Sequence, residues 1–470
     1  MKIVMKFGGT SVGSVPALEQ VVTIIQQAQD AGHEVIAVVS AMSKVTDLLL
    51  TAANQAELGN ETAVHEIRQQ VEEKHQEATL AFLGPTDTQA VVMTEINQLL
   101  DEFESLCHGI HVLGELTNRA LDVIGGLGER LSVRQVAAIL QENNLPAVAV
   151  EATDLIVTDK RHGSASPLVE ETAEKSRAVL NPYWNDNKIP VVTGFIAATV
   201  DGVQTTLGRG GSDYSATIIG RAIEADEVWI WTDVNGVMTA DPRIVSDAKT
   251  IPHLSYAEVG ELAYFGAKVL HPQAIRPARR ANIPVRMLNT FDPDNTGTLM
   301  DQNVELDGHA VKGITVIKNL SMITVAGTGM MGVPGVAARI FSAVAQIERS
   351  VLMISQSSSE QSICFVVATT DAPHVMSVLN EEMARELERR DLDEIAVQDG
   401  VAILAVVGAG MKGTPGVSAR VFSALGKAQI NVVAIAQGSS EYNISVVALE
   451  GNADEAVRLI HAEFGLGEPG

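Results

Sequence analysis

The sequence predicts an α/β protein in which an open, mostly parallel sheet is followed by two small α+β modules. Up to about residue 300, buried strand-like runs alternate with amphipathic helical segments, which is typical of an open α/β sheet. After that point, one stretch of sequence repeats at an offset of 81 residues. Apolar residues make up 46% of the 470 residues, so the chain can bury sizeable cores.

The first elements are a strand, a glycine-rich turn, a helix and a second strand. Residues 1–7 are apolar and β-prone, residues 15–31 have a helical pattern, and residues 34–40 form a strand predicted to be buried on both faces. A long helical region covers about 60–145. Further strands are expected at 146–150, 189–199, 227–233 and 283–290.

The repeat predicts two modules of similar fold. Residues 329–346 align with 410–427, and residues 352–367 align with 433–448. Each copy has the order strand, helix, strand, strand, helix, which suits a small α+β module.

The number of strands suggests how the two modules are connected. The first copy has a further strand at 395–400, the second copy has none before Gly470, and an unassigned strand at 311–318 precedes the first copy. Sequence adjacency favours two consecutive modules, whereas the strand count favours one module inserted within the other. On the second view the domains are 1–300, 319–400, and 305–318 together with 401–470.

Charge and cysteine content exclude several classes of protein. The sequence has 33 Lys and Arg against 58 Asp and Glu, a net charge of −25, which repels nucleic acids and anionic membranes. Cys107 and Cys364 lack the paired spacing of a disulfide framework or a zinc site. No signal peptide or apolar run of about 18 residues is found, so we expect a cytoplasmic protein.

The first candidate site is the turn that contains Lys6, Gly8, Gly9 and Ser11. A lysine at the end of a strand, followed by two glycines and a hydroxyl at a helix start, suits phosphate binding, because backbone amides and the helix terminus attract anions. The spacing is not that of a Walker loop. The alternative is a tight turn with a lysine that faces solvent.

A second glycine-rich loop, residues 206–215, leads into another helix. Three glycines around Arg209 expose backbone amides beside a guanidinium group that can bind a carboxylate with two hydrogen bonds. Asp213 stands at the helix start, where it either caps the helix or acts in catalysis.

Two later segments could serve the same site. Residues 231–243 follow a strand, where open α/β sheets bind ligands, although a polar loop is equally expected there. Lys268 either reaches a nucleotide or caps a helix. The G-x-G-x-x-G patterns at 327–332 and 408–413 lack an acid at the end of the next strand, which disfavours a dinucleotide site.

Six motifs occur in the order seen in aspartate kinases. They are KFGGTSV, VVSAMSKVTD, GERLS, TLGRGGSDYSA, TDVNGVMTADPR and ELAYFGAKVLHP. The C-terminal repeat resembles the tandem ACT modules of that family, so the resemblance covers essentially the whole chain. It implies an amino-acid kinase fold followed by two ferredoxin-like ACT modules. Because the sequence stops at Gly470, we expect the monofunctional form without a dehydrogenase.

The resemblance also implies an activity and roles for residues. The family transfers the γ-phosphoryl group of ATP, with Mg²⁺, to the β-carboxylate of L-aspartate, the first step towards lysine, threonine, methionine and isoleucine. By matching positions, the catalytic residues are Lys6 and Asp213. The aspartate-binding residues are Ser40, Thr46, Glu129, Arg209 and Ser212, with Glu129 on the α-ammonium and Arg209 on the α-carboxylate. The ATP-binding residues are Lys6, Gly8, Gly9, Ser11, Thr232, Asp233, Arg243 and Lys268.

The chemistry of these residues agrees with that reaction. An aspartate side chain titrates near pH 4, so the acceptor carboxylate is already ionised and needs no general base. The difficulty is the repulsion between two anions, which lysine, glycine amides and a helix terminus relieve. A non-catalytic amino-acid sensor is the alternative class, and the charged residues kept in the motifs disfavour it.

The ACT modules resemble amino-acid sensors that form dimers and inhibit the kinase, although they could serve assembly alone. We therefore expect a homo-oligomer and an effector site that includes Gln356, Ser357 and Gln437. Lysine-inhibited relatives carry an acid on the second strand of the first module, whereas residues 351–356 here read VLMISQ. This favours threonine over lysine as the effector.

Overall fold

The computed structural model describes residues 1–267, 270–304, 308–357 and 359–467, and Lys268 lies outside these residues. Within the described residues the chain forms two compact units. The first comprises Met1–Val237, Pro252–Tyr256 and Leu270–Asn303, and the second comprises Met238–Ile251, Ala257–Val269 and Val304–Gly470. The second unit therefore includes two segments that the sequence assigns to the first 300 residues.

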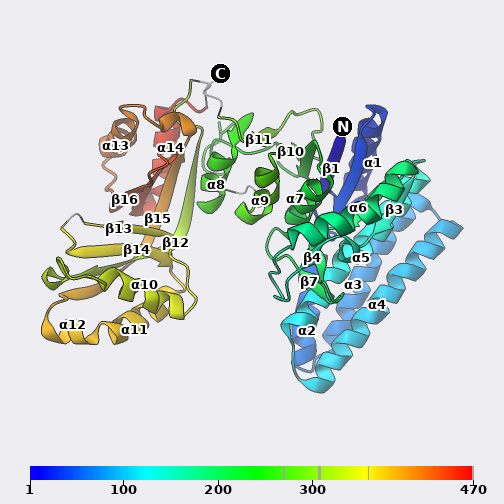
Figure 1. Ribbon diagram of the computed structural model, residues 1–470, viewed down its shortest axis with the longest axis horizontal. Helices are drawn as coiled ribbons and strands as arrows, with labels where there is room; N and C mark the ends of the chain where they lie inside the picture. Colours follow the sequence, from blue (N-terminus) through cyan, green and yellow to red (C-terminus); the bar gives the residue numbers. More distant parts are fainter. Residues whose placement is uncertain (268–269, 305–307, 358, 468–470) are drawn as a thin grey trace. The chain divides into compact units, whose positions relative to one another are not determined.

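The first unit is built on a sheet with strand order β3-β5-β2-β1-β8-β10-β11-β9 (Figure 1). Its strands are β1 Lys2–Phe7, β2 Glu34–Val39, β3 Ala147–Val150, β5 Ile189–Thr193, β8 Glu227–Thr232, β9 His253–Ser255, β10 Val285–Asn289 and β11 Thr298–Asp301. The pairing is parallel except between β10 and β11. This confirms the predicted open, mostly parallel sheet.

Strand β1 lies inside this sheet, and apolar side chains fill both of its faces. Ile3, Met5 and Phe7 on one face and Val4 on the other are fully buried. Each such side chain contributes roughly 1.5–3 kcal/mol through burial. The core therefore fixes the end of β1, where Lys6 is placed.

The first unit also contains helices that pack on the sheet or on one another. They are α1 Val15–Asp30, α2 Val45–Glu57, α3 Glu61–Leu83, α4 Asp87–Leu113, α5 Asn118–Glu142, α6 Val169–Asn185, α7 Gly211–Ile223 and α9 Pro272–Ala281. The long helical region consists of α3, α4 and α5, and each of these helices begins at an N-cap. The side chains of Asn60, Thr86 and Thr117 each accept a hydrogen bond from a backbone N–H three residues later. Helices α3 and α4 run side by side (Figure 1).

The strand predicted over 189–199 divides into two. Strand β5 ends at Thr193, and β6 (Ile196–Thr199) joins a small sheet with β4 (Val157–Thr158) and β7 (Gln204–Thr206). The break falls at Phe195, whose φ of 63° is uncommon for a residue with a side chain. The chain turns here beside the end of β5.

The second unit contains a sheet with strand order β13-β14-β12-β15-β17-β16. Its strands are β12 Gly313–Ala326, β13 Met353–Gln356, β14 Ser362–Ala368, β15 Glu394–Val407, β16 Ala434–Gln437 and β17 Asn443–Leu449. Its helices are α8 Tyr256–Tyr264, α10 Val336–Gln346, α11 Ala372–Glu382, α12 Ala384–Arg389, α13 Val417–Lys427 and α14 Ala453–Glu463.

The predicted strands at 311–318 and 395–400 are parts of the longer strands β12 and β15. Strand β12 has an irregularity between Ile317 and Leu320, where Asn319 has a φ of 60°. Before this point β12 pairs with the second half of β15, and after it with β14 and the first half of β15. Interleaved modules would give such a pairing, and both the interleaving and the domain boundaries stay a prediction.

Long-range hydrogen bonds attach the two added segments to the second unit. Thr239 and His461 are hydrogen-bonded at 3.0 Å, and the N–H of Ala409 donates to Glu258 at 2.7 Å. The Thr315 hydroxyl donates to the carbonyl of Phe265 at 2.8 Å. Helix α8 is therefore part of the same unit as the sequence repeat, although α8 comes before the repeat in the sequence.

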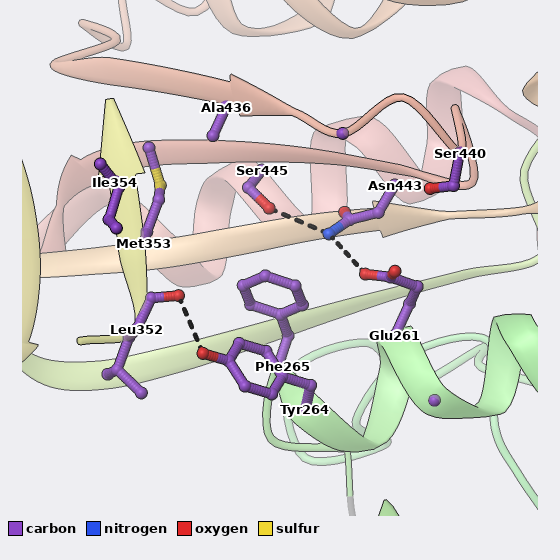
Figure 2. A pocket seen from close by; sticks show the side chains of 12 residues that line it. Glu261, Tyr264, Phe265, Leu352, Met353, Ile354, Ala436, Ser440, Asn443 and Ser445 are labelled. Atoms are coloured by element: carbon purple, nitrogen blue, oxygen red, sulfur yellow. Dashed lines mark hydrogen bonds between the residues drawn. The ribbon is translucent and has the colours of Figure 1, made fainter. Parts of the chain in front are cut away.

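A cavity of about 410 Å³ lies where α8 faces strands β13 and β16. Figure 2 shows the Asn443 amide between Glu261 and Ser445, at 3.1 and 3.0 Å, and the Tyr264 hydroxyl 3.3 Å from the carbonyl of Leu352. None of the predicted effector residues lines this cavity.

In the described part of the chain, none of the helices combines the length and the apolar character that a membrane crossing requires.

Candidate active site

A cavity of about 470 Å³ lies in the first unit, at the carboxyl ends of β1 and β2 and the N-terminus of α7. Ligands bind at this edge in open α/β sheets. Eight predicted site residues line it, namely Lys6, Gly9, Ser40, Thr46, Glu129, Arg209, Ser212 and Asp213. The structure thus brings together residues that are up to about 200 positions apart in the sequence.

An ion pair lies at the centre of this cavity. The Lys6 ammonium is 2.6 Å from the Asp213 carboxylate, and both side chains are largely buried. Asp213 stands in the first turn of α7, whose N-cap is Gly210. In the structure, its carboxylate therefore contacts the lysine and does not provide the N-cap of the helix.

Two glycines allow the first loop to pack closely. A Cβ atom on Gly9 would lie 2.9 Å from the carbonyl oxygen of Ala41, and one on Gly13 would lie 2.6 Å from that of Gly9. The N–H of Gly8 donates to the carbonyl of Trp231. Side chains at these glycines would push the loop away from the neighbouring strand ends.

Glu129 is a buried carboxyl group, 4% exposed, on α5. Burial raises its pKa to about 8, although a backbone hydrogen bond from Ala41 and the Lys6 charge act in the opposite direction. One of its oxygens has no hydrogen-bond partner among the described residues. Glu129 is therefore largely neutral at pH 7, and a cation brought beside it would favour its ionised form.

Arg209 follows Gly208, which has a φ of 77°. A Cβ atom on Gly208 would lie 3.2 Å from the carbonyl oxygen of Gly163, so the loop around Gly163 packs directly against the arginine loop. On the other side, burial and then the Arg209 charge lower the pKa of His271. Arg209 has no carboxylate within 4.0 Å among the described residues, so its charge is available to a ligand.

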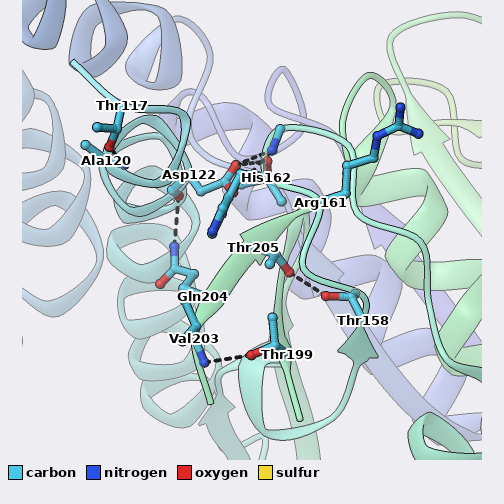
Figure 3. A network of polar contacts seen from close by, with 12 residues as sticks. Thr117, Ala120, Asp122, Thr158, Arg161, His162, Thr199, Val203, Gln204 and Thr205 are labelled. Carbon is cyan, nitrogen blue, oxygen red and sulfur yellow. Dashed lines mark hydrogen bonds and ion pairs between the residues drawn. The ribbon is translucent and has the colours of Figure 1, made fainter. Parts of the chain in front are cut away.

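A polar network fixes the loop that packs against Gly208 (Figure 3). Its centre is Asp122, which is 1% exposed on α5. The Asp122 carboxylate contacts Nδ1 of His162 at 2.6 Å and accepts from the N–H of Gly163 at 3.0 Å and from the Thr206 hydroxyl. Asp122 thus joins α5 to the end of β7 and to the neighbouring loop, just before Arg209.

Several lining residues were not predicted from the sequence. Phe195 lies against α7, where a Cβ atom on Gly211 would come within 2.5 Å of its ring. Lys44 lines the cavity with a φ of 70°, and the Lys74 ammonium donates to the carbonyl of Ser43 at 2.5 Å. In the sequence, the only indication that Phe195 lies near the site is that Gly194 and Phe195 directly follow a buried strand.

The residues predicted to bind ATP are less concentrated. Ser11 is fully buried, and its hydroxyl is hydrogen-bonded to that of Thr290 at 2.7 Å. Thr232 ends β8 and Asp233 follows it, and the Thr232 hydroxyl donates to the Asp233 carboxylate. Arg243 belongs to the second unit, where it pairs with Asp241. Gly8, Ser11, Thr232, Asp233 and Arg243 do not line the cavity around Lys6, and Lys268 lies outside the described residues.

The predicted effector residues lie on the second unit. Gln356 ends β13 and lines a cavity of about 340 Å³ together with residues 332–337 and Glu360. The backbone of Ser357 is hydrogen-bonded to Ser362, and Gln437 is exposed at the equivalent end of β16. The structure places Gln356 and Gln437 at matching positions of the repeat, and only Gln356 lines this cavity.

The described residues contain no group of three or more His, Cys, Asp or Glu side chains that could hold a metal ion. Mg²⁺ in kinases is held mainly by the substrate phosphates with one or two carboxylates. Asp213 and Asp47 supply carboxylates to the cavity. These two carboxylates fit an ion that arrives with a nucleotide.

Comparison with known families agrees with this architecture. The model of the amino acid kinase family matches residues 1–289, and that of the ACT domain matches 323–383 and 404–464. The chain is 38% identical over 468 residues to the chloroplastic bifunctional aspartokinase/homoserine dehydrogenase 1 of Arabidopsis thaliana, covering 98% of this chain and 51% of that protein. It thus spans about half the length of the bifunctional relatives it matches.

Shorter relatives match over most of their length. Chloroplastic aspartokinase 3 of Arabidopsis thaliana is 34% identical, with 98% of this chain and 81% of that protein covered. Among solved structures, aspartokinase III of E. coli in complex with aspartate and ADP has a TM-score of 0.81 at 30% identity, covering 98% and 99% of the two chains. The same enzyme with lysine and aspartate has a TM-score of 0.78.

Proposed function

We propose that the protein transfers the γ-phosphoryl group of ATP to the β-carboxylate of L-aspartate. The chain belongs to the amino acid kinase family and, within that family, to the aspartokinases. The observation that carries the proposal is the convergence of Lys6, Asp213, Arg209 and Glu129 on one cavity. The E. coli relative was solved with aspartate and ADP, which supports the choice of substrates.

The cavity offers partners for each charged group of aspartate. Arg209 supplies a fork of donors for the α-carboxylate. Glu129 supplies an acceptor for the α-ammonium, and the arriving cation favours the ionised carboxylate that burial alone disfavours. Ser40, Thr46 and Ser212 add hydroxyl groups that can orient the substrate. The β-carboxylate is then left to face Lys6.

The proposed step forms one bond and breaks one. A β-carboxylate oxygen attacks the γ-phosphorus of ATP, the bond from that phosphorus to the bridging oxygen breaks, and ADP leaves with the electron pair. No proton moves, because the acceptor is already an anion. Lys6 would neutralise charge on the transferring group, and Asp213 would hold the ammonium of Lys6 in place before ATP arrives.

Mg²⁺ bound to the nucleotide would neutralise phosphate charge. Asp213 is the carboxylate best placed to face it, because it lies at the N-terminus of α7 beside Lys6. Gly9 and the start of α1 would offer backbone amides to the phosphates. The N–H of Gly8 is already donated to the carbonyl of Trp231, so Gly8 is assigned to the nucleotide side on the family resemblance alone. We assign Ser11, Thr232, Asp233, Arg243 and Lys268 to the nucleotide side on the family resemblance alone.

We further propose that an end-product amino acid inhibits the enzyme at the second unit. The cavity beside Gln356 is large enough for an amino acid, and the carboxylate of Glu360 also lines it. Glutamine at both strand ends, Gln356 and Gln437, favours threonine over lysine as the effector. Lysine remains the competing effector, because a related aspartokinase was solved with it.

We propose a homo-oligomer that forms through the second unit. Two large apolar side chains are exposed on its edge strands, Ile354 (49%) on β13 and Ile435 (44%) on β16. Edge strands with exposed apolar side chains tend to pair with another chain. The cytoplasmic location stays a prediction of the sequence.

A coupled assay for ADP release tests the proposed function. L-Aspartate should stimulate ADP release, whereas L-glutamate and N-acetyl-L-glutamate should not. Threonine and lysine, added separately and together, then identify the effector. ADP release that is independent of aspartate, or absent with every acceptor, would contradict the proposal.

A further inference from the structure

A second large cavity lies in the first unit, away from Lys6. It has a volume of about 590 Å³ and is lined by residues of α6, α7 and α9. Four arginines line it, namely Arg177 on α6, Arg221 on α7, and Arg276 and Arg280 on α9. None of these residues lines the cavity around Lys6.

Three of the four guanidinium groups lack an internal counter-charge. Arg177 pairs with Glu224 at 2.7 Å. By contrast, Arg221, Arg276 and Arg280 have no carboxylate within 4.0 Å among the described residues. Arg276 and Arg280 also stand one turn apart on α9, where two like charges destabilise a helix unless an anion lies between them. In a chain with a net charge of −25, this is a local excess of positive charge.

The rest of the lining adds an apolar floor and a hydroxyl group. Ile218 and Pro277 are buried and belong to the lining of the cavity. Tyr214 is partly buried. Burial raises the pKa of its hydroxyl group, and the positive charges of Arg276 and Arg280 act in the opposite direction. Glu170 and Glu224 also line the cavity, so a ligand with a single negative charge would gain little.

We propose that this cavity binds a small multivalent oxyanion, of the polyphosphate or polycarboxylate kind, through Arg221, Arg276 and Arg280. Guanidinium groups bind phosphate and carboxylate in the same two-pronged geometry, so both kinds of ligand fit. The volume admits a molecule larger than a single phosphate ion. The site does not depend on the proposed kinase activity, because it shares no residue with the cavity around Lys6.

Isothermal titration of the full chain with pyrophosphate and with citrate tests the proposal. Both are titrated without Mg²⁺ and at constant ionic strength. We expect at least one of them to bind with an affinity that falls at least tenfold in the double variant Arg276→Ala, Arg280→Ala. The tighter of the two identifies the kind of oxyanion.

Arg279→Ala is the matched control, because Arg279 lies on the same helix and carries the same charge but does not line the cavity. Its affinity should stay within twofold of the wild type. If the double variant does not fold, the exposed single change Arg280→Gln should still weaken binding several-fold. Equal binding by the wild type and the Arg280→Gln or double variant, or no binding of either anion at millimolar concentration, would overturn the proposal.

Discussion

The buried carboxyl group of Glu129 makes the stability of the first unit depend on pH. In the unfolded chain this group titrates near 4.5, and in the folded chain its pKa is raised to about 8 by burial. The folded state therefore holds the proton more tightly. The stabilisation is complete below about pH 4.5 and is lost as the pH rises through the folded pKa.

The shift fixes a rough magnitude for this loss. A difference of about 3.5 pKa units corresponds to roughly 5 kcal/mol across the whole range. Roughly 1 kcal/mol of it is lost between pH 7 and pH 9, where the folded-state group ionises. Replacing Glu129 by Gln removes this titration. Between pH 7 and pH 9 the free energy of unfolding of the variant should therefore fall by roughly 1 kcal/mol less than that of the wild type.

Urea unfolding followed by tryptophan fluorescence measures the effect. The three tryptophans, Trp184, Trp229 and Trp231, all lie in the first unit, so the signal reports on that unit. Glu142→Gln is the matched control, since Glu142 lies on the same helix and is exposed. If Glu129→Gln and the wild type lose the same stability from pH 7 to pH 9, Glu129 is not neutral in the free protein and the reasoning fails.

Three further predictions concern the sites. Asp213→Asn should lower turnover at least a hundredfold with an unchanged circular dichroism spectrum, because it leaves Lys6 without its anionic partner; near-normal kcat would remove Asp213 from the mechanism. Asp122→Ala should cost about 2–4 kcal/mol in urea unfolding, because buried donors lose their acceptor, and it should raise the KM for aspartate through the loop beside Arg209; an unchanged KM would show that the network serves stability alone. Gln356→Ala should raise the amino-acid concentration that half-inhibits the enzyme at least tenfold without changing uninhibited turnover, and unchanged inhibition would place the effector elsewhere.

The sequence was sufficient for the fold class and for the cluster of residues at the ends of β1 and β2. Both follow from local patterns, because glycine-rich turns after buried strands mark the edge where ligands bind. Lys6, Arg209 and Asp213 line one cavity, which agrees with that prediction. Their catalytic roles remain predictions.

Other features depend on long-range contacts that a local pattern does not contain. Asp122 reads as an ordinary polar residue of a helix, yet in the fold it meets His162, 40 positions later. Helix α8 reads as part of the first 300 residues, but Glu258 bonds to the backbone of Ala409, 151 positions later. The positive φ of Phe195 likewise occurs where α7, which begins 16 positions later, packs against this residue.

Trapping of the phosphorylated product tests the central claim most directly. In the presence of hydroxylamine, an acyl phosphate formed from L-aspartate is converted to a hydroxamate that can be measured beside ADP. The account predicts one hydroxamate for each ADP in the wild type and neither product above background in Lys6→Ala. ADP without hydroxamate in the wild type, or both products at full rate in Lys6→Ala, would contradict phosphoryl transfer to aspartate at this site.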